Sequence, residues 1–332
     1  MATGMTYQRK DTANGKILSL GSINADFQMR TKRQPEVSET LLASDFAKLG
    51  GGKAANVAYL ARRLGHHAQL FAHTGDDDLS EQAIAPLRET GVDLSGIKKI
   101  KNAHTGVTMI TVPPDGKKSI VMAANANGFW CQDDALPVLQ AIREADPGSV
   151  LVADCEIPVF IVEQAMRSAR QRGIVTILDP SPAERVTEAV LKLTDFIAPN
   201  CGETRALTDI ECDDLASAID AGRILLERGV RVACIKLADG GCVVVEDGCA
   251  FHIAPVPVEV VDTTGAGDAF TGALSVALLE GYPLHHAARF AVAASHLAVT
   301  AYGSQPAYPT REQIERMERR LETSTHVRQP IH

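Results

Sequence analysis

The sequence has neither a long apolar run nor an excess of positive charge. Its longest apolar runs, such as 241–245 and 291–294, fall far short of the roughly 20 residues that span a bilayer. The 41 acidic residues outnumber the 33 basic ones and give a formal net charge of −8. This charge argues against a partner such as duplex DNA, whose binding depends on neutralising many phosphates. We therefore expect no membrane and no nucleic acid among the partners.

Signals for secretion and for disulfide bonds are also missing. Residues 1–16 are polar and lack the apolar core of a secretory signal, so we expect a cytoplasmic protein. The seven cysteines are odd in number and no two have Cys-x-x-Cys spacing, which indicates reduced thiols rather than a disulfide framework or a zinc site. At 332 residues the chain can build a sizeable core, as one large domain or two modest ones.

The sequence does contain a regular alternation of strand-like and helix-like segments. Residues 16–20 form a β-rich run that ends at Gly21, and residues 53–64 carry apolar side chains at helical spacing before Gly65. The alternation predicts further strands at 68–73, 149–154, 174–179, 195–199 and 230–237, and helices at 79–90, 159–172 and 214–228. Units of this length predict an α/β fold, in which helices cover both faces of a parallel sheet.

Two segments, 37–49 and 104–123, interrupt this alternation. The second is typical of a hairpin, with strands at 105–112 and 119–122 around a turn at 113–116. We predict that the two segments pair as a small sheet that stands off the main body as a lid over the ligand site. The pattern alone is equally compatible with an antiparallel extension of the main sheet.

The strongest local signal is the run from Val260 to Phe270, which leads into an apolar helix. Gly265 and Gly267 allow a tight turn with unobstructed amides, and the new helix points its unpaired N–H groups at the same place. Asp268 lies in the first turn of this helix, where the helix dipole favours an acidic residue whatever its function. This structural role explains Asp268 but not the two glycines beside it. Phosphoryl transfer to an alcohol requires a carboxylate beside an anion hole, so we predict that Asp268 is the base of such a reaction.

A glycine triplet precedes Lys53 at the start of the first predicted helix, in the segment 49–56. It is not a Walker loop, because Lys53 is followed by Ala54 and the glycine spacing is wrong, and it lacks the Gly-x-Gly-x-x-Gly of a dinucleotide fold. Two readings remain open. The glycines provide either a flexible entry to the helix or a close backbone approach to a polar ligand, with Asn56 as a hydrogen-bonding partner.

Two more polar pairs follow predicted strands. Asn24 and Asp26 come after the first strand, where they form either an Asx turn or part of a ligand site at the carboxyl end of the sheet. Asn200 and Glu203 are three residues apart and form either a helix capping box or a site for hydrated Mg²⁺. The local sequence does not distinguish between these possibilities.

Taken in this order, the clusters resemble the ribokinase-like (phosphofructokinase B) carbohydrate kinase family over residues 16–314. The matching motifs are Gly-Ser-Ile-Asn-Ala-Asp at 21–26, Gly-Gly-Lys-x-Ala-Asn at 51–56, Thr-Gly-Asp-Asp at 74–77, Pro-Asn-x-x-Glu at 199–203, Asp-Thr-x-x-Ala-Gly-Asp at 262–268 and Gly-x-Gln-Pro at 303–306. The resemblance implies a three-layer αβα sandwich with a mostly parallel central sheet and a small β-sheet lid, through which a homodimer forms. It implies a kinase domain at 16–324, a lid from about 27–50 and 104–126, and tails at 1–15 and 325–332.

The resemblance also implies a reaction, in which ATP and ribose give ribose 5-phosphate and ADP, and a role for each matching residue. Asp268 is the implied base, and the amides of Gly265, Ala266 and Gly267 form the implied anion hole. The implied sugar ligands are Asn24, Asp26, Gly52, Lys53, Asn56 and Glu156, and the implied nucleotide ligands are Asn200, Glu203, Lys236, Ala238 and Gly241. Glu203 is expected to act indirectly on Mg²⁺, and Asp262, Thr264, Val299 and Gly303 to surround a potassium ion.

One departure from the family pattern bears on the substrate. Ala54 stands where the family usually has Gly in the sugar loop, and an extra methyl group beside a buried sugar can shift preference by about 1–3 kcal/mol. The alternative acceptors are 2-deoxyribose, a nucleoside or fructose. A non-catalytic sugar or nucleotide sensor is the alternative from another class, and the presence of Asp268 argues against it. The missing Gly-x-Gly-x-x-Gly argues against a nicotinamide oxidoreductase.

Overall fold

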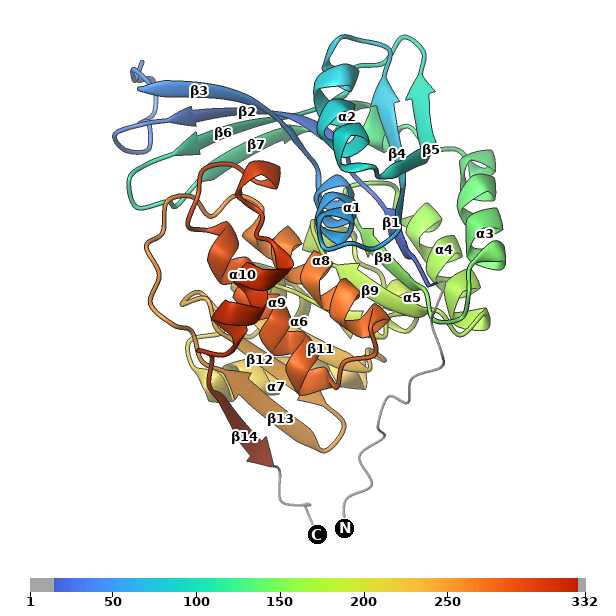
Figure 1. The fold of residues 1–332 in the computed structure, drawn as a ribbon, viewed down its shortest axis with the longest axis vertical. Coiled ribbons are helices and arrows are strands. Elements are labelled where there is room, and N and C mark those ends of the chain that lie inside the picture. The colour runs from blue at the N-terminus through green and yellow to red at the C-terminus, as the bar shows by residue number, and fades with distance from the viewer. Residues whose placement is uncertain (1–14, 328–332) are drawn as a thin grey trace.

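The computed structural model describes residues 15–327, so the predictions for residues 1–14 and 328–332 lie outside the described residues. Within that range a ten-stranded sheet has the order β14-β13-β12-β11-β10-β9-β8-β1-β4-β5. From β11 to β5 every neighbouring pair is parallel, and β12, β13 and β14 extend the sheet antiparallel (Figure 1). The strands are β1 (Ile17–Leu20), β4 (Ala68–Gly75), β5 (Asp93–Ile100), β8 (Val150–Asp154), β9 (Val175–Asp179), β10 (Phe196–Ile197), β11 (Val232–Lys236), β12 (Cys242–Glu246), β13 (Cys249–Ile253) and β14 (Thr323–Val327).

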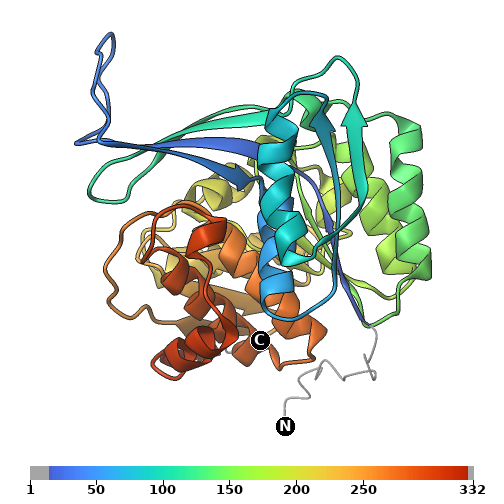
Figure 2. The same ribbon diagram turned by 45° about the horizontal axis from the view of Figure 1, so that its top comes forward.

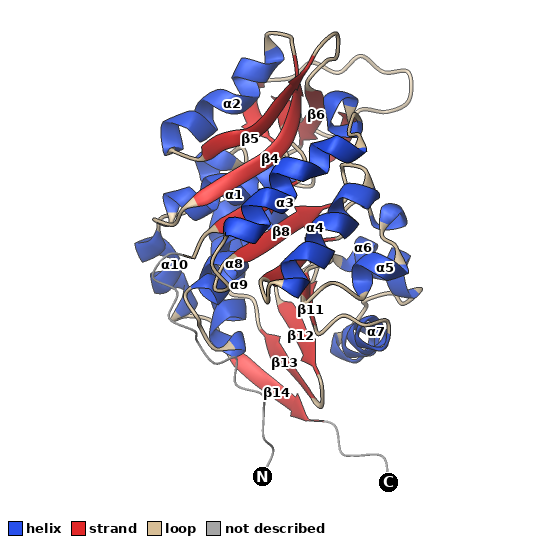
Figure 3. Ribbon diagram, turned by 90° about the vertical axis from the view of Figure 1, so that its right-hand side faces the viewer, coloured by secondary structure: helices blue, strands red, loops and turns tan. Residues whose placement is uncertain are grey.

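Helices cover both faces of this sheet (Figure 3). One apolar core joins the sheet to α1 (Lys53–Arg63), α2 (Leu79–Thr90), α8 (Ala266–Leu279), α9 (Leu284–Ala298) and α10 (Arg311–Glu318). A second core, on the other face, joins it to α3 (Ala135–Glu144), α4 (Val159–Gln171), α5 (Glu188–Leu191), α6 (Cys201–Thr208) and α7 (Leu215–Glu227). The predicted three-layer α/β sandwich with a mostly parallel sheet is confirmed.

A separate four-stranded sheet of order β3-β2-β6-β7 stands off the main body (Figure 2). Its strands are β2 (Asn24–Arg30), β3 (Asp45–Gly51), β6 (Gly106–Val112) and β7 (Ser119–Ala123). The predicted hairpin is confirmed, because β6 and β7 pair antiparallel. The alternative, an extension of the main sheet, is wrong.

Several predicted boundaries differ from the structure. Asn24 and Asp26 do not lie in a loop after the first strand but in β2, whose alternate residues are buried against the body. Residues 37–44 form no strand, so only the end of the predicted segment 37–49 enters the small sheet. At the other end of the chain, β14 includes residues 325–327, which the sequence assigns to a tail, because they pair with β13.

The helix α8 lies at the centre of the fold. Every residue from Asp268 to Leu279 is buried, and an apolar character on all sides is typical of a helix that is surrounded by other elements. It packs between α1, α9 and the sheet. This packing fixes the position of the first turn of α8, where the sequence predicts the base. Among residues 15–327, no helix has the length and apolar character needed to cross a membrane.

Candidate active site

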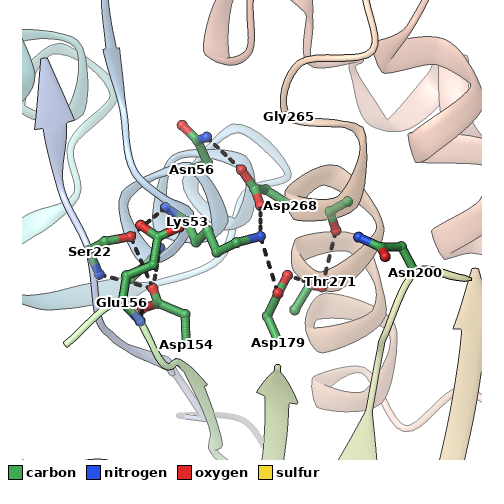
Figure 4. Close-up of polar contacts among 12 residues, drawn as sticks. Ser22, Lys53, Asn56, Asp154, Glu156, Asp179, Asn200, Gly265, Asp268 and Thr271 are labelled. Atoms are coloured by element: carbon green, nitrogen blue, oxygen red, sulfur yellow. Dashed lines mark hydrogen bonds and ion pairs between the residues drawn. The ribbon is translucent and has the colours of Figure 1, made fainter. Parts of the chain in front are cut away.

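The predicted site residues gather at the carboxyl ends of the central parallel strands, where open α/β sheets bind ligands. Asp154 and Asp179 end β8 and β9, and the starts of α1 and α8 face them across the site (Figure 4). The strand β2 of the small sheet begins at the same place, two residues after Ser22. Segments far apart in the sequence therefore meet at one edge of the main sheet.

Asp268 is buried in the first turn of α8 and is held from two sides. The amide of Asn56 donates to Asp268 Oδ2 at 2.7 Å, and Lys53 Nζ lies 3.3 Å from Asp268 Oδ1. Gln305 Nε2 in turn donates to Asn56 Oδ1 at 3.0 Å. Because its oxygen is already engaged by Gln305, Asn56 presents its N–H group to the carboxylate (Figure 4).

Lys53 joins two carboxylates, since its Nζ also lies 3.1 Å from Asp179 Oδ1. Burial alone lowers the pKa of this ammonium group, but the charges of Asp179 and Asp268 raise it well above its usual value. Burial raises the pKa of Asp179, but Lys53 and Lys236 reverse that effect and lower it. Lys53 is thus a permanent cation beside Asp268.

The turn before α8 is the place where the sequence predicts an anion hole. Gly265 is the N-cap residue with φ of 74°, and it offers no side chain to accept from the first amides of the helix. A Cβ at Gly265 would lie 2.6 Å from Ser304 Cβ, so no other residue fits there. A Cβ at Gly267 would lie 3.2 Å from Lys236 Nζ, which places a second ammonium group beside the same amides.

The glycines before Lys53 allow a close approach of the backbone to neighbouring protein segments, and the approach to a polar ligand stays a prediction. A Cβ at Gly51 would lie 2.0 Å from Asp26 Oδ2, and one at Gly52, whose φ is 95°, would lie 2.5 Å from Ile23 Cα. The start of α1 is held by Asp154, whose Oδ2 accepts from the amide of residue 54 at 3.2 Å.

Asp26 and Glu156 are buried carboxylates with spare acceptor capacity. Among residues 15–327, Asp26 Oδ1 and Glu156 Oε2 have no hydrogen-bond partner. Burial, with the nearby charges of Asp268 and Glu156, raises the pKa of Asp26 to about 7. Burial likewise raises the pKa of Glu156, although Lys53 opposes it. Asn24 lies beside them, where its Oδ1 accepts from Asn127 at 2.8 Å.

Asn200 and Glu203 form the capping box of α6, one of the two alternatives for this pair. Glu203 N donates to Asn200 Oδ1 at 2.9 Å, and Asn200 N donates to Glu203 Oε2 at 2.8 Å. The negative charge of Glu203 also contributes to the raised pKa of Lys53. The cap does not exclude a role toward Mg²⁺, a hard cation that keeps several waters and needs few protein oxygens.

A cavity of about 400 Å³ opens beside Thr263, in the loop that leads into α8. Ala238, Thr263 and Val299 line it together with prolines and valines of the segment 255–260. Lys236 and Gly241, which the sequence groups with Ala238, are not among its lining residues. Gly241 instead belongs to a turn, in which its N–H donates to Asp239 Oδ1 at 2.8 Å.

The predicted potassium ligands also come together. Asp262 is fully buried and accepts from Thr264 N at 2.8 Å, from Gly303 N at 2.9 Å and from the Gln28 side chain. The carbonyl of Val299 accepts from Asp262 N at 3.2 Å. Within residues 15–327 no basic side chain lies within 4.0 Å of the Asp262 carboxylate, although Gln28 Oε1 beside it has no partner. A buried carboxylate with only neutral donors, next to an unpaired oxygen, fits a monovalent cation.

The sequence analysis missed four residues of this site. Asp154 and Asp179 end predicted strands, so the rule that drew attention to Asn24 could have found them. Ser22, whose N–H donates to Asp154 Oδ2 at 2.9 Å, lies inside a quoted motif. Gln305 also lies inside a motif, but only its packing against Asn56 reveals its role.

Comparison with known proteins agrees with this geometry. Residues 14–311 match the family described as "pfkB family carbohydrate kinase". The chain belongs to this family. It is therefore a carbohydrate kinase, an enzyme that transfers a phosphoryl group.

Three members of the pfkB family illustrate the similarity. The chain is 32% identical over 294 residues to a ribokinase of Haemophilus influenzae, which covers 89% of this chain and 95% of the relative. It is 29% identical to a deoxyribokinase of Salmonella typhi over 90% of this chain and 97% of the relative. The structure of Arabidopsis thaliana ribokinase complexed with ribose and ATP superposes with a TM-score of 0.80, at 29% identity, over 92% of this chain and 98% of that one.

Proposed function

We propose that this carbohydrate kinase transfers the γ-phosphoryl group of Mg-ATP to the 5-hydroxyl of D-ribose. The observation that carries the proposal is the placement of the buried Asp268 carboxylate in the first turn of a helix whose N-terminus is the uncapped turn at Gly265. Relatives named as ribokinases, with about 30% identity over most of the chain, support ribose as the acceptor.

Asp268 acts as the general base. The oxygen of the sugar hydroxyl forms a bond to the γ-phosphorus as its proton passes to Asp268, and the bond from phosphorus to the bridging oxygen breaks with its electron pair leaving on ADP. Asn56 and Lys53 hold the carboxylate in place during this step. The amides of the turn formed by Gly265, Ala266 and Gly267 stabilise the charge on the moving group.

The sugar binds between β2 and the start of α1. The unpaired oxygens of Asp26 and Glu156 accept from sugar hydroxyls, since a buried acceptor without a partner is costly. Asn24, Gly52, Lys53 and Asn56 complete the list of proposed sugar ligands. Ala54, the departure from the family pattern, packs in the apolar core beside α8. Because its methyl group is part of that core, we keep ribose as the proposed acceptor.

The nucleotide binds along the cavity beside Thr263, whose apolar walls suit a flat aromatic base. Ala238 lines the base site, and Lys236 meets the phosphates next to Gly267. Asn200, Glu203 and Gly241 complete the list of proposed nucleotide ligands, and Glu203 acts on Mg²⁺ through water. When bound, Mg²⁺ neutralises the charge that develops on the phosphates.

A potassium ion is the proposed occupant of the site around Asp262. Its carboxylate, together with Thr264, Val299 and Gly303, would hold the ion beside the anion-hole turn. A cation there supplies charge compensation for the buried carboxylate and keeps the turn in position.

The small sheet serves as a lid and as the interface of a homodimer. Its outward residues Phe27, Phe46, Met109 and Val121 form an apolar face, with Val121 74% exposed. A second copy of the chain would bury this face. Val121→Lys should then convert a dimer into a monomer in light scattering, whereas an unchanged mass would contradict the interface. The seven free thiols suit the cytoplasm, where we place the reaction.

ADP release from Mg-ATP tests the function, with ribose, 2-deoxyribose, adenosine and fructose in parallel, with and without potassium. Fast turnover on ribose supports the proposal. Preference for another acceptor would leave the kinase chemistry intact and overturn the substrate. Binding without turnover on any of the four would favour a sensor.

A further inference from the structure

A lysine of the small sheet reaches the anion-hole turn. Lys118 follows the turn between β6 and β7, and its Nζ donates to the carbonyl oxygen of Thr263 at 2.7 Å. The hairpin turn is held there by Thr263 Oγ1, which donates to Gly116 O at 2.8 Å, and by Thr263 N, at 3.3 Å from the same oxygen. The tip of the hairpin is therefore bound to the loop that leads into α8.

The same carbonyl places Lys118 beside the anion hole. Ala266 N also donates to Thr263 O, at 3.4 Å, so the ammonium group and the first amide of α8 share one acceptor. Lys53 and Lys236 approach the turn from α1 and β11. Three ammonium groups from three different segments of the chain thus lie close to residues 263–268.

Lys118 lacks an anionic partner. Its two acceptors, the carbonyl oxygen and the hydroxyl of Thr263, are neutral, and within residues 15–327 no carboxylate lies within 4.0 Å of its Nζ. Burial lowers its pKa, the charges of Asp268 and Asp262 oppose this, and those of Lys53 and Lys236 add to it. A half-buried ammonium group in this position is stabilised when a ligand brings negative charge to it.

We propose that Lys118 binds the transferred phosphoryl group of ATP and stabilises its charge as it moves to the sugar. The inference rests on the proposed function and adds to it a ligand that comes from the lid. The ammonium group exchanges the neutral Thr263 carbonyl for a phosphoryl oxygen, so that the attraction between opposite charges adds to the hydrogen bond. Lys118 is part of the hairpin, so it can stabilise the charge on the phosphoryl group only while the small sheet is docked against the loop before α8. The docked sheet also excludes water from the site.

The test compares Lys118→Met with Lys118→Arg and with Lys117→Met. Lys117 is the matched control, because it is adjacent and exposed and its hydrogen bonds, to Gln34 and Asp115, are made by its backbone. We expect Lys118→Met to lower kcat about 10²–10³-fold, the range for one lost donor to a developing anion, with little change in KM for the sugar. Lys118→Arg should recover most of the rate, and Lys117→Met should match the wild type within about twofold. Equal rates for Lys118→Met and Lys117→Met would overturn the inference.

A binding measurement separates this inference from the choice of sugar. Calorimetric titration with Mg-ADP and with the non-hydrolysable analogue Mg-AMP-PNP gives an affinity ratio that reports the γ-phosphate contact alone. Lys118→Met should lower that ratio about tenfold or more, with ADP affinity unchanged. A reduced ratio in a protein that phosphorylates none of the sugars would support Lys118 and overturn the proposed substrate. An unchanged ratio would overturn Lys118 and leave the proposed function standing.

Discussion

Removal of the Lys53 ammonium group should destabilise the protein strongly. Its Nζ lies 3.1 Å from Asp179 Oδ1 and 3.3 Å from Asp268 Oδ1, and only 21% of the lysine side chain is exposed. Lys53→Met keeps most of the side-chain volume but leaves two carboxylates buried without their cation. The loss of one partner from a buried ion pair costs about 3–5 kcal/mol. Lys236 still faces Asp179, so we expect a value near the lower end, about 3 kcal/mol.

The matched control is Lys98→Met. Lys98 also pairs with a buried aspartate, Asp134, but 54% of the lysine side chain is exposed, so water screens the pair and its removal should cost less than about 1 kcal/mol. Urea unfolding of both variants gives the two free energies directly. The double variant Lys53→Met, Asp179→Asn should recover part of the loss, because it removes one of the orphaned charges.

Equal losses for the Lys53 and Lys98 variants would refute this reasoning. So would a double variant that is less stable than Lys53→Met, since the carboxylate of Asp179 would then be stabilising without its cation.

Three further predictions follow from the geometry of the site. Gly265→Ala should lower kcat at least about 100-fold, because its Cβ would lie 2.6 Å from a neighbouring side chain. Gly248 has a similar φ but no atom near the position of a Cβ, so Gly248→Ala should leave the rate of ADP release unchanged. Equal rates of ADP release in the two variants would contradict this prediction. Burial raises the pKa of Asp26 to about 7, so between pH 4 and 7 the folded chain holds a proton that the unfolded chain has released. The free energy of unfolding should therefore fall as pH rises, by up to about 4 kcal/mol. Urea unfolding of the wild type and of Asp26→Asn across this pH range measures the fall, which should be smaller in the variant. The same fall in both proteins would oppose this assignment. Potassium should raise the melting temperature of the wild type more than that of Asp262→Asn, and an equal rise in both would count against the cation site.

The sequence predicted the parts of the site that local geometry determines. The turn at Gly265 and the acid at Asp268 lie three residues apart, and the start of a helix fixes their relation. The parallel sheet was predictable for the same reason, since helical and strand periodicities are local. The small sheet was predicted only in part, because the polar residues Asn24 and Asp26 suggested a loop, whereas pairing with β3 and β6 makes them part of β2.

The missing parts depend on packing between distant segments. Gln305 orients Asn56 across 249 residues, and Lys118 meets Thr263 across 145 residues. Neither contact leaves a periodic or spacing signal, because each partner lies in a different element whose position follows from the whole fold. Strand β14 is a similar case: Thr323, Ser324 and Thr325 are polar and exposed, and only pairing with β13 defines the strand.

The most direct test of the central claim is to identify the product by phosphorus NMR after incubation with Mg-ATP and D-ribose. The account predicts ribose 5-phosphate in equal amount to ADP, with coupling of the phosphorus to the two C5 protons. In Asp268→Asn the shape of the side chain remains but the base is lost, so the rate should fall about 10²–10⁴-fold. Phosphate on another hydroxyl, or a variant as fast as the wild type, would contradict the account.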